Sequence, residues 1–325
     1  MSRTLCLISL LLLAAFTLLL ALAIGSASFS LGETWAGLNG SGDPLVRELI
    51  YELRLPRALT AFGTGAALAI AGVMLQVLLR NPLADPYILG TSGGAAAAAL
   101  WAMSLGASGI VLNSAAFAGA LGSTLMVFVL ARSGGSWTPG RLLLTGVVTA
   151  AGWGALVTLM LALAPDTNLR GMLFWLMGDF SFVTNPWPIL ILAGLAIIAG
   201  LGLARSLNVL ATGQDQAALL GVNVGPLRVS LYLLSSLLTA VAVTTAGTVG
   251  FVGLVIPHLV RLLTGSDHRI VIPCAALAGG TLLVAADLVA RTIVAPQQLP
   301  VGAITAAIGV PLFLVLLKKS QGNAN

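Results

Sequence analysis

Residues 56–79 decide the fold, and they read PRALTAFGTGAALAIAGVMLQVLL. After Arg57 no charged residue occurs before Arg80. A transmembrane α-helix needs about 20 predominantly apolar residues, so this stretch predicts a helix that crosses a bilayer. Its glycines and alanines also predict close packing, because small residues let two helix backbones approach each other in lipid. Alternatively, helix faces lined with small residues slide past each other when a transport pathway opens and closes.

The composition of the whole chain agrees with a membrane protein. Of 325 residues, 58% are hydrophobic and 8% are charged, whereas a soluble domain carries about 25% charged residues. These charged side chains are too few to form a polar surface around a protein of this size. Its apolar surface must therefore face lipid. The net charge of +5 comes from scattered basic residues, which excludes a nucleic-acid surface.

Similar apolar runs recur along the chain and predict an all-α, polytopic membrane protein with a single transmembrane domain over residues 1–325. The first run ends in Gly25-Ser-Ala-Ser28 and so resembles a cleaved signal peptide, but its length favours a retained helix. We expect about ten transmembrane helices, near residues 4–26, 56–79, 92–107, 110–132, 142–164, 187–205, 227–246, 247–263, 271–292 and 302–319.

The basic residues predict the orientation, because cytoplasmic loops carry an excess of Lys and Arg. With both termini in the cytoplasm, that side receives Arg3, Arg80, Arg132, Arg141, Arg205, Arg228, Arg261, Arg269, Lys318 and Lys319. The outer side receives Arg47, Arg54, Arg57, Arg170 and Arg291. We therefore expect both termini to be cytoplasmic.

Few side chains offer chemistry. Asp287 is the one acid well inside an expected span, and Arg291 lies one helical turn later, where it can pair with the acid. A structural pair and an ion-coupling site both remain open. Two cysteines and two histidines lie too far apart to suggest a metal site.

Glycine and proline interrupt the last spans. Gly250 and Gly253 precede Pro257 and His258, and Gly309 precedes Pro311. Proline within a helix removes a backbone hydrogen bond and bends the helix. Such bends either line a transport pathway or are simple kinks.

Short motifs follow one another in a fixed order along the chain. They are Arg54-Leu-Pro-Arg57, Gly65-Ala-Ala-Leu-Ala-Ile-Ala-Gly72, Asn81-Pro-Leu-Ala-Asp-Pro86, Gly213-x-x-x-Ala217-x-x-Leu220-Gly221, Gly250-Phe-Val-Gly-Leu-Val-Ile-Pro-His258, Ala286-Asp-x-x-Ala-Arg291 and Leu299-Pro-x-Gly302-x-x-Thr305-x-x-x-Gly309-x-Pro311. The order of these motifs resembles the FecCD family, the permease subunits of type II ABC importers for iron–siderophore complexes, haem and cobalamin. The cobalamin permeases of that family are similar in length and in these motifs.

The resemblance implies the partners. It predicts a homodimer in the bacterial inner membrane, two cytoplasmic ABC ATPase subunits and a periplasmic substrate-binding protein. The chain lacks the G-x-x-x-x-G-K-[ST] loop that binds ATP, so ATP-Mg would belong to the partner ATPase and the permease would bind no cofactor and catalyse no reaction.

The resemblance also assigns residues. The coupling segment 213–225 would contact the ATPase through Gly213, Asp215, Ala217, Ala218, Leu220 and Gly221; the alternative is an ordinary surface helix. Arg54, Arg57 and Arg291 would dock the binding protein, unless they form internal ion pairs. The pathway or gate would include Thr145, Thr149, Gly250, Gly253, Pro257, His258, Gly309 and Pro311. The 133–141 loop departs from the family pattern near the cytoplasmic gate.

Two rival classes are a secondary transporter driven by an ion gradient and a membrane-embedded enzyme. The first needs a coupling-ion site near the midplane, for which Asp287 is the one candidate. The second needs a catalytic constellation that the sequence does not contain. Iron–siderophore, haem and cobalamin all remain open as the cargo.

Overall fold

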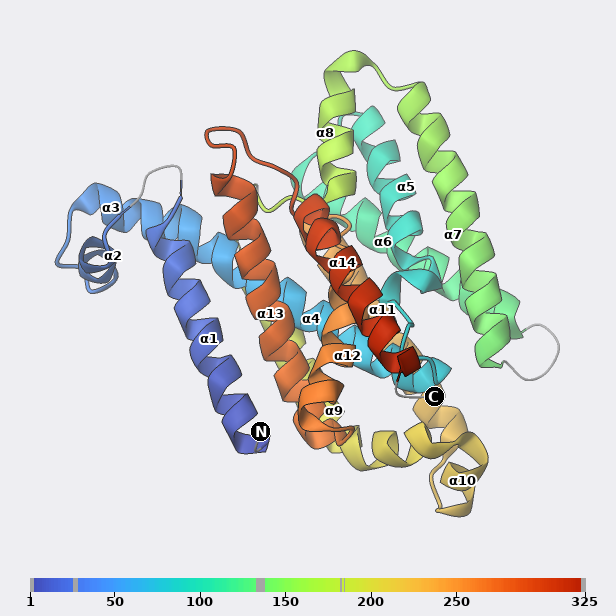
Figure 1. The fold of residues 1–325 in the computed structure, drawn as a ribbon. Coiled ribbons are helices and arrows are strands. Elements are labelled where there is room, and N and C mark those ends of the chain that lie inside the picture. Colours follow the sequence, from blue (N-terminus) through green and yellow to red (C-terminus); the bar gives the residue numbers. More distant parts are fainter. Residues whose placement is uncertain (1–2, 26–28, 133–137, 182, 184, 323–325) are drawn as a thin grey trace.

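The computed structural model describes residues 3–25, 29–132, 138–181, 183 and 185–322. Helices joined by turns make up these ranges, and no strand occurs in them (Figure 1). The predicted all-α class is therefore confirmed for the described residues.

Seven helical segments in the described part of the chain are long and apolar enough to cross a membrane. They are α1 (Arg3–Ala23), α4 (Leu55–Leu79) with the residues before it from Pro44, α6 (Gly109–Arg132), α7 (Pro139–Ala162), α9 (Trp187–Thr212), α11 (Val224–Ala246) and α13 (His268–Thr292). The chain is thus a multi-pass membrane protein. Three further helices fall in expected spans: α5 (Thr91–Ser104), α12 (Val252–Thr264) and α14 (Val301–Gly322). The total of ten spans stays a prediction.

Helix α4 is the centre of the bundle. It contacts α13, α11, α9 and α12, and in Figure 1 it runs behind α13 through the middle of the molecule. Nearly every residue from Ala58 to Leu79 is buried. A helix that is apolar on all sides is stable only when other helices surround it, which is why this stretch occupies the core.

Glycine pairs set the distance between α4 and its neighbours. A Cβ atom added at Gly65 would lie 2.7 Å from the carbonyl carbon of Gly279 on α13. One added at Gly72 would lie 2.8 Å from the Cα atom of Gly253 on α12. Real Cβ atoms do not approach other atoms so closely, so both contacts require glycine. The small residues of the opening stretch therefore act in packing.

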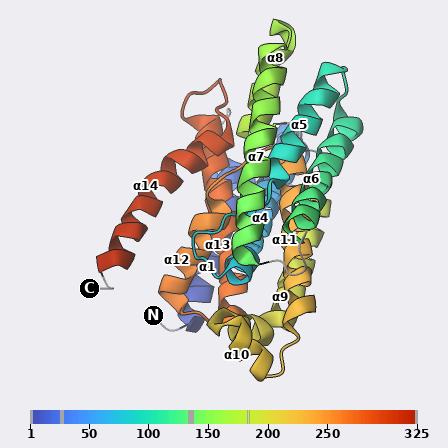
Figure 2. The same ribbon diagram turned by 90° about the vertical axis from the view of Figure 1, so that its right-hand side faces the viewer.

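The two ends of the bundle carry different connections. The start of α1, the end of α14 and the short helix α10 (Gln214–Leu219) lie at one end (Figures 1 and 2). Helix α8 (Asp166–Met177) and the turn between α13 and α14 lie at the other end. If both termini are cytoplasmic, they must lie at the same end of the bundle, as they do here. Which end faces the cytoplasm stays a prediction. We call the α10 end inner and the α8 end outer.

Several short helices differ from the sequence expectation. Residues 31–54 form α2 (Leu31–Leu38), α3 (Pro44–Glu48) and a π-helical turn, η1 (Leu49–Arg54), and α8 follows α7. A search for long apolar runs does not detect them. The signals present were local: Ser30 and Glu33 form a capping box, and Asp43 caps α3 ahead of Pro44.

The eighth expected span is also shorter than its sequence suggests. The sequence predicts a start at residue 247, but α12 begins at Val252, because Phe251 (φ +70°) immediately before it adopts the left-handed conformation. That conformation cannot continue a right-handed helix. The sixth span, expected to end at residue 205, continues as α9 to Thr212.

Candidate functional site

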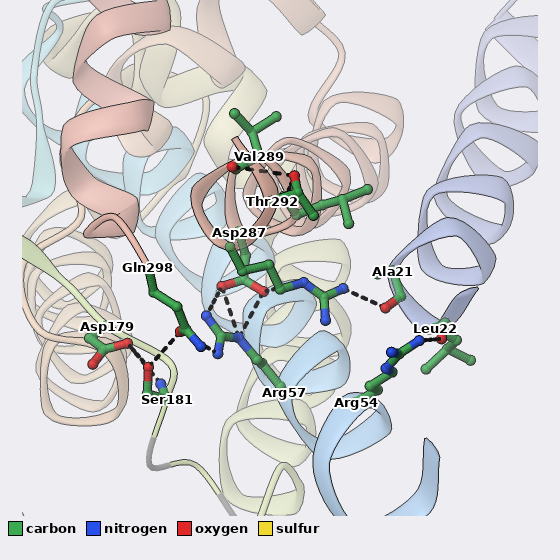
Figure 3. Close-up of polar contacts among 12 residues, drawn as sticks. Ala21, Leu22, Arg54, Arg57, Asp179, Ser181, Asp287, Val289, Thr292 and Gln298 are labelled. Carbon is green, nitrogen blue, oxygen red and sulfur yellow. Dashed lines mark hydrogen bonds and ion pairs between the residues drawn. The ribbon is translucent and has the colours of Figure 1, made fainter. Parts of the chain in front are cut away.

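A buried network of charges occupies the outer end of α4 and α13. Arg57, in the first turn of α4, donates from Nε to both Asp287 carboxylate oxygens at 3.0 and 3.1 Å, and from Nη2 to Oδ1 at 2.8 Å. Asp287 lies on α13 and is 3% exposed. A buried carboxylate is stable only when it is paired and hydrogen-bonded, and Arg57 supplies both conditions (Figure 3).

Two more arginines connect this network to α1. Arg291 forms an ion pair with Asp287 at 3.8 Å and donates from Nη2 to the carbonyl of Ala21. Arg54 donates from Nη1 to the carbonyls of Leu22 at 2.7 Å and Ala23 at 2.9 Å. The last carbonyls of a helix have no partner within the helix, so the two guanidinium groups satisfy the C-terminal end of α1.

The network also reaches two outer loops. Arg57 Nη1 donates to Gln298 Oε1 at 3.0 Å, in the connection between α13 and α14. Ser181 Oγ lies 2.9 Å from the same oxygen and 2.6 Å from Asp179 Oδ1, in the connection between α8 and α9. Figure 3 shows the continuous series of contacts from Asp179 to Ala21. Three helices, α1, α4 and α13, and two loops are thereby joined at one end of the bundle.

This geometry changes how the three outer arginines are understood. Arg54 and Arg291 are buried, and Arg57 is only partly exposed. The internal pair of Arg291 with Asp287, which the sequence left open, is present. Docking of a binding protein on these arginines stays a prediction. The side chains of these arginines are largely buried, which indicates a structural role as well. The distribution of charges in the sequence does not reveal this burial.

At the inner end, the expected coupling segment contains α10. Leu219 and Leu220 are 88% and 70% exposed, while Ala217 is fully buried. The expected contact segment therefore divides: Ala217 packs against the bundle, whereas Leu219 and Leu220 project from it. Leu219 and Leu220 thus form a small apolar surface at the end of a short helix.

The attachment of α10 to the bundle is well defined. Gly213 (φ +148°) joins it to α9, and Gly221 (φ +80°) ends it. Gln214 Oε1 accepts a hydrogen bond from Arg228 Nη1 of α11 at 3.3 Å. Asp215 and Ala218 are exposed. A short helix held between two spanning helices in this way can pass a movement on to them.

A buried amide that the sequence analysis missed lies between α4 and α12. Gln76 Nε2 is 3.1–3.3 Å from the carbonyl oxygens of Ala84, Gly253 and Leu254, and Gln76 Oε1 accepts a hydrogen bond from Arg261. The available signal was a single amide within the apolar run 58–79. Gln76 fixes the first turn of α12 against the loop that follows α4.

That loop contains a perturbed carboxyl group. Asp85 Oδ1 accepts a hydrogen bond from Tyr87 N at 2.8 Å and so begins the 3₁₀ turn η2 (Pro86–Leu89). Burial raises the pKa of Asp85 to about 6, although the hydrogen bond from Tyr87 acts in the opposite direction. Pro86 in turn packs against Gly253.

The residues expected along a pathway do not form one cluster. Thr145 and Thr149 are half-buried on α7, and a Cβ atom at Gly90 would meet Thr149 Cγ2 at 3.3 Å. Gly309 of α14 packs on Phe251, next to Gly250. Gly253 and Pro257 are buried, His258 is half-buried and Pro311 is exposed. In the 133–141 loop, residues 133–137 lie outside the described residues, so the gate expected there is not described.

Comparisons with known proteins agree with this fold. The fold defines the class of a multi-pass helical membrane protein. The model of the FecCD transport family matches residues 11–319, and the chain belongs to that family. The predicted resemblance is therefore confirmed.

Individual relatives and a solved structure are similar over nearly the whole chain. The hemin transport system permease protein HmuU of Yersinia pestis is 40% identical over 331 residues, covering 94% of each chain. The vitamin B12 import system permease protein BtuC of Vibrio cholerae is 40% identical over 89% of this chain and 88% of its own. A solved transporter, described as of the metal-chelate ABC type and inward-facing, matches with a TM-score of 0.86 at 35% identity, covering 96% and 98% of the two chains.

Proposed function

We propose that this chain is the membrane-spanning permease subunit of an ABC importer that takes up a metal chelate across the bacterial inner membrane. The observation that carries this proposal is the set of full-length relatives named for hemin and vitamin B12 transport, since both cargoes are metal chelates. Iron–siderophore complexes, haem and cobalamin are the candidate cargoes.

The energy for transport would enter through the coupling segment. The exposed leucines of α10 offer the apolar contact that a cytoplasmic ATPase would cover, and Gly213 and Gly221 set the helix apart from α9 and α11. ATP-Mg would bind to two ATPase subunits, and the permease would transmit their movement. Asp215, in the first turn of α10, is placed where a helix N-terminus favours an acid.

The pathway would lie between two permease copies. Helix α7 leaves most of its apolar side chains uncovered, among them Leu144 and Val148. Helix α14 exposes Leu314 and Val315, and Figure 2 shows it standing apart from the other helices. A second copy of the chain would cover part of these faces. Thr145, Thr149, Gly250, Gly309 and Pro311 would then lie near the space between the copies.

At the outer end, a binding protein would deliver the cargo. Of the three arginines, Arg57 keeps the largest exposure, at 13% of its side chain, so an acidic partner residue would reach Arg57 first. Surface charge pairs of this kind favour orientation and association rate more than affinity.

The ion-gradient alternative is weakened by the geometry around Asp287. A coupling acid must exchange its ion during transport, whereas Asp287 is held by two arginines. A stable pair of this kind favours a structural role.

The proposal is tested by reconstitution in liposomes with the cognate ATPase and binding protein. ATP hydrolysis should rise when binding protein loaded with hemin, vitamin B12 or a ferric siderophore is added. Uptake that continues without ATP and disappears with the ion gradient would instead support secondary transport.

A further inference from the structure

The segment between α1 and α4 carries an apolar face that no other part of the described chain covers. On α2, Leu31 and Trp35 lie one helical turn apart and are 65% and 63% exposed. The opposite side faces inward: Gly37 is buried, and a Cβ atom there would meet Ile50 Cδ1 at 2.9 Å. The exposure of Trp35 thus belongs to a helix that is packed on its other side.

The segment is folded and is not a loose connection. Tyr51 donates a hydrogen bond from Oη to the carbonyl of Leu38 at 2.9 Å, which ties η1 to the end of α2. The capping box of Ser30 and Glu33 fixes the start of α2. Leu45 and Leu53 extend the exposed apolar surface onto α3 and η1. A folded surface with several exposed apolar side chains is stable when something other than water covers it.

This surface continues the lipid-facing side of α1. Helix α1 is a membrane-span candidate that exposes Leu12, Phe16 and Leu19, and its contacts with α2 and η1 bring the two surfaces together. Figure 1 shows α2 and α3 beside the outer part of α1, on the side away from α13. Helix α2 lies next to the span and not beyond its end, so the lipid that surrounds α1 also meets α2.

We propose that residues 31–54 form an interfacial anchor, which seats Leu31, Trp35 and Leu45 in the headgroup region of the outer leaflet. Amphipathic helices at such a site insert about 5–10 Å into the boundary between headgroups and acyl chains. Tryptophan and tyrosine are enriched at this depth, because their rings are apolar and their polar atoms remain hydrated. Glu33 lies on the other side of α2 from Trp35, as an anchored helix requires.

The charge of residues 31–54 indicates which interaction binds them to the membrane surface. Residues 31–53 contain Glu33, Asp43, Glu48 and Glu52 against the single cation Arg47. An acidic segment gains nothing from anionic lipid, so the anchor depends on apolar insertion. Since Arg54 ends the segment and holds the last carbonyls of α1, the anchor would fix the depth at which α1 and α4 meet the outer surface.

The anchor can be tested with nitroxide spin labels on the full chain in lipid nanodiscs. Cys6 and Cys274 are replaced by alanine, and a single label is placed at Leu31→Cys, at Asp166→Cys on exposed α8 as the water reference, or at Leu12→Cys as the lipid reference. Oxygen collides with labels in lipid and a water-soluble nickel chelate with labels in water. At position 31 we expect oxygen to dominate, at a depth of about 5–10 Å, and at position 166 the nickel chelate.

A second pair of variants isolates the role of Trp35. With the label at position 31, Trp35→Glu should shift accessibility from oxygen towards the nickel chelate, while Trp35→Leu should preserve the lipid signature. Nickel accessibility at position 31 in the unmodified background would overturn the proposal. Protection from both reagents would also overturn it, because a protein partner or a second copy would then cover the face. The proposal would also be overturned if the label at position 31 reached this depth only in nanodiscs that contain anionic lipid.

Discussion

Arg57 and Asp287 are 230 positions apart in the sequence, yet two nitrogens of Arg57 hold the carboxylate of Asp287. The pair joins the first turn of α4 to the outer half of α13, and Arg291 extends the connection to α1. A bidentate pair fixes orientation as well as distance. The outer ends of three helices are thus held in one arrangement by a single carboxylate.

Replacing that carboxylate should destabilise the protein. Asp287→Asn leaves two buried guanidinium groups without their counter-charge, and removal of one partner from a buried pair costs about 3–5 kcal/mol. The free energy of unfolding, measured by denaturing-detergent titration of purified protein, should fall by this amount. Asp166→Asn, at an exposed acid on α8, should change it by less than about 1 kcal/mol. Equal effects of the two variants would contradict the structural role of Asp287.

The contact between α4 and α12 predicts a different sensitivity. Gly72→Ala places a Cβ atom against the backbone of Gly253, and overpacking of this kind costs about 1–3 kcal/mol. Gly194→Ala, on α9, introduces the same atom where none lies within 4 Å, so it should be neutral or slightly stabilising. Thermal unfolding of the two variants in the same lipid makes the comparison, and a stable Gly72→Ala protein would be inconsistent with this packing.

The loop after α4 predicts a dependence on pH. The pKa of Asp85 rises on folding from 3.8 to about 6, so between these values the unfolded chain loses a proton that the folded protein retains. Stability therefore falls as pH rises through this range, by about 2–3 kcal/mol in total, and is constant above it. Asp85→Asn keeps an acceptor for Tyr87 N and should remove this slope, which leaves the variant more stable at pH 7. Parallel stability curves for the two proteins would refute the assignment.

Much of the fold follows from hydropathy, because lipid requires long apolar helices. The central position of residues 56–79 follows from a stretch that is apolar on every side. Hydropathy does not predict short helices such as α2 and α8, because they do not span the membrane and need no long apolar run. The start of α12 at Val252 depends on the left-handed backbone of Phe251, and that conformation is uncommon for a residue other than glycine.

The candidate sites were predictable only in part. The sequence placed Arg54, Arg57 and Arg291 at the outer side by charge, but it cannot show that they turn inward, because their partners on α1 and α13 are distant in sequence. The pairing of Asp287 with Arg291 was visible from helical spacing, whereas the stronger pairing with Arg57 was not. Ala217 and Leu219 are both apolar, and only tertiary contacts decide that one is buried and the other exposed.

The central claim is that ATP-driven movement reaches the permease through α10. The most direct measurement is chelate uptake into liposomes that contain the permease, its ATPase and the binding protein, using the double variant Leu219→Glu with Leu220→Glu. The exchange places two acids where an ATPase would contact leucine, on side chains that touch little of the permease itself. We predict loss of uptake with unchanged thermal stability, while Gln216→Glu on the same helix retains uptake. Normal uptake by the double variant would contradict the account.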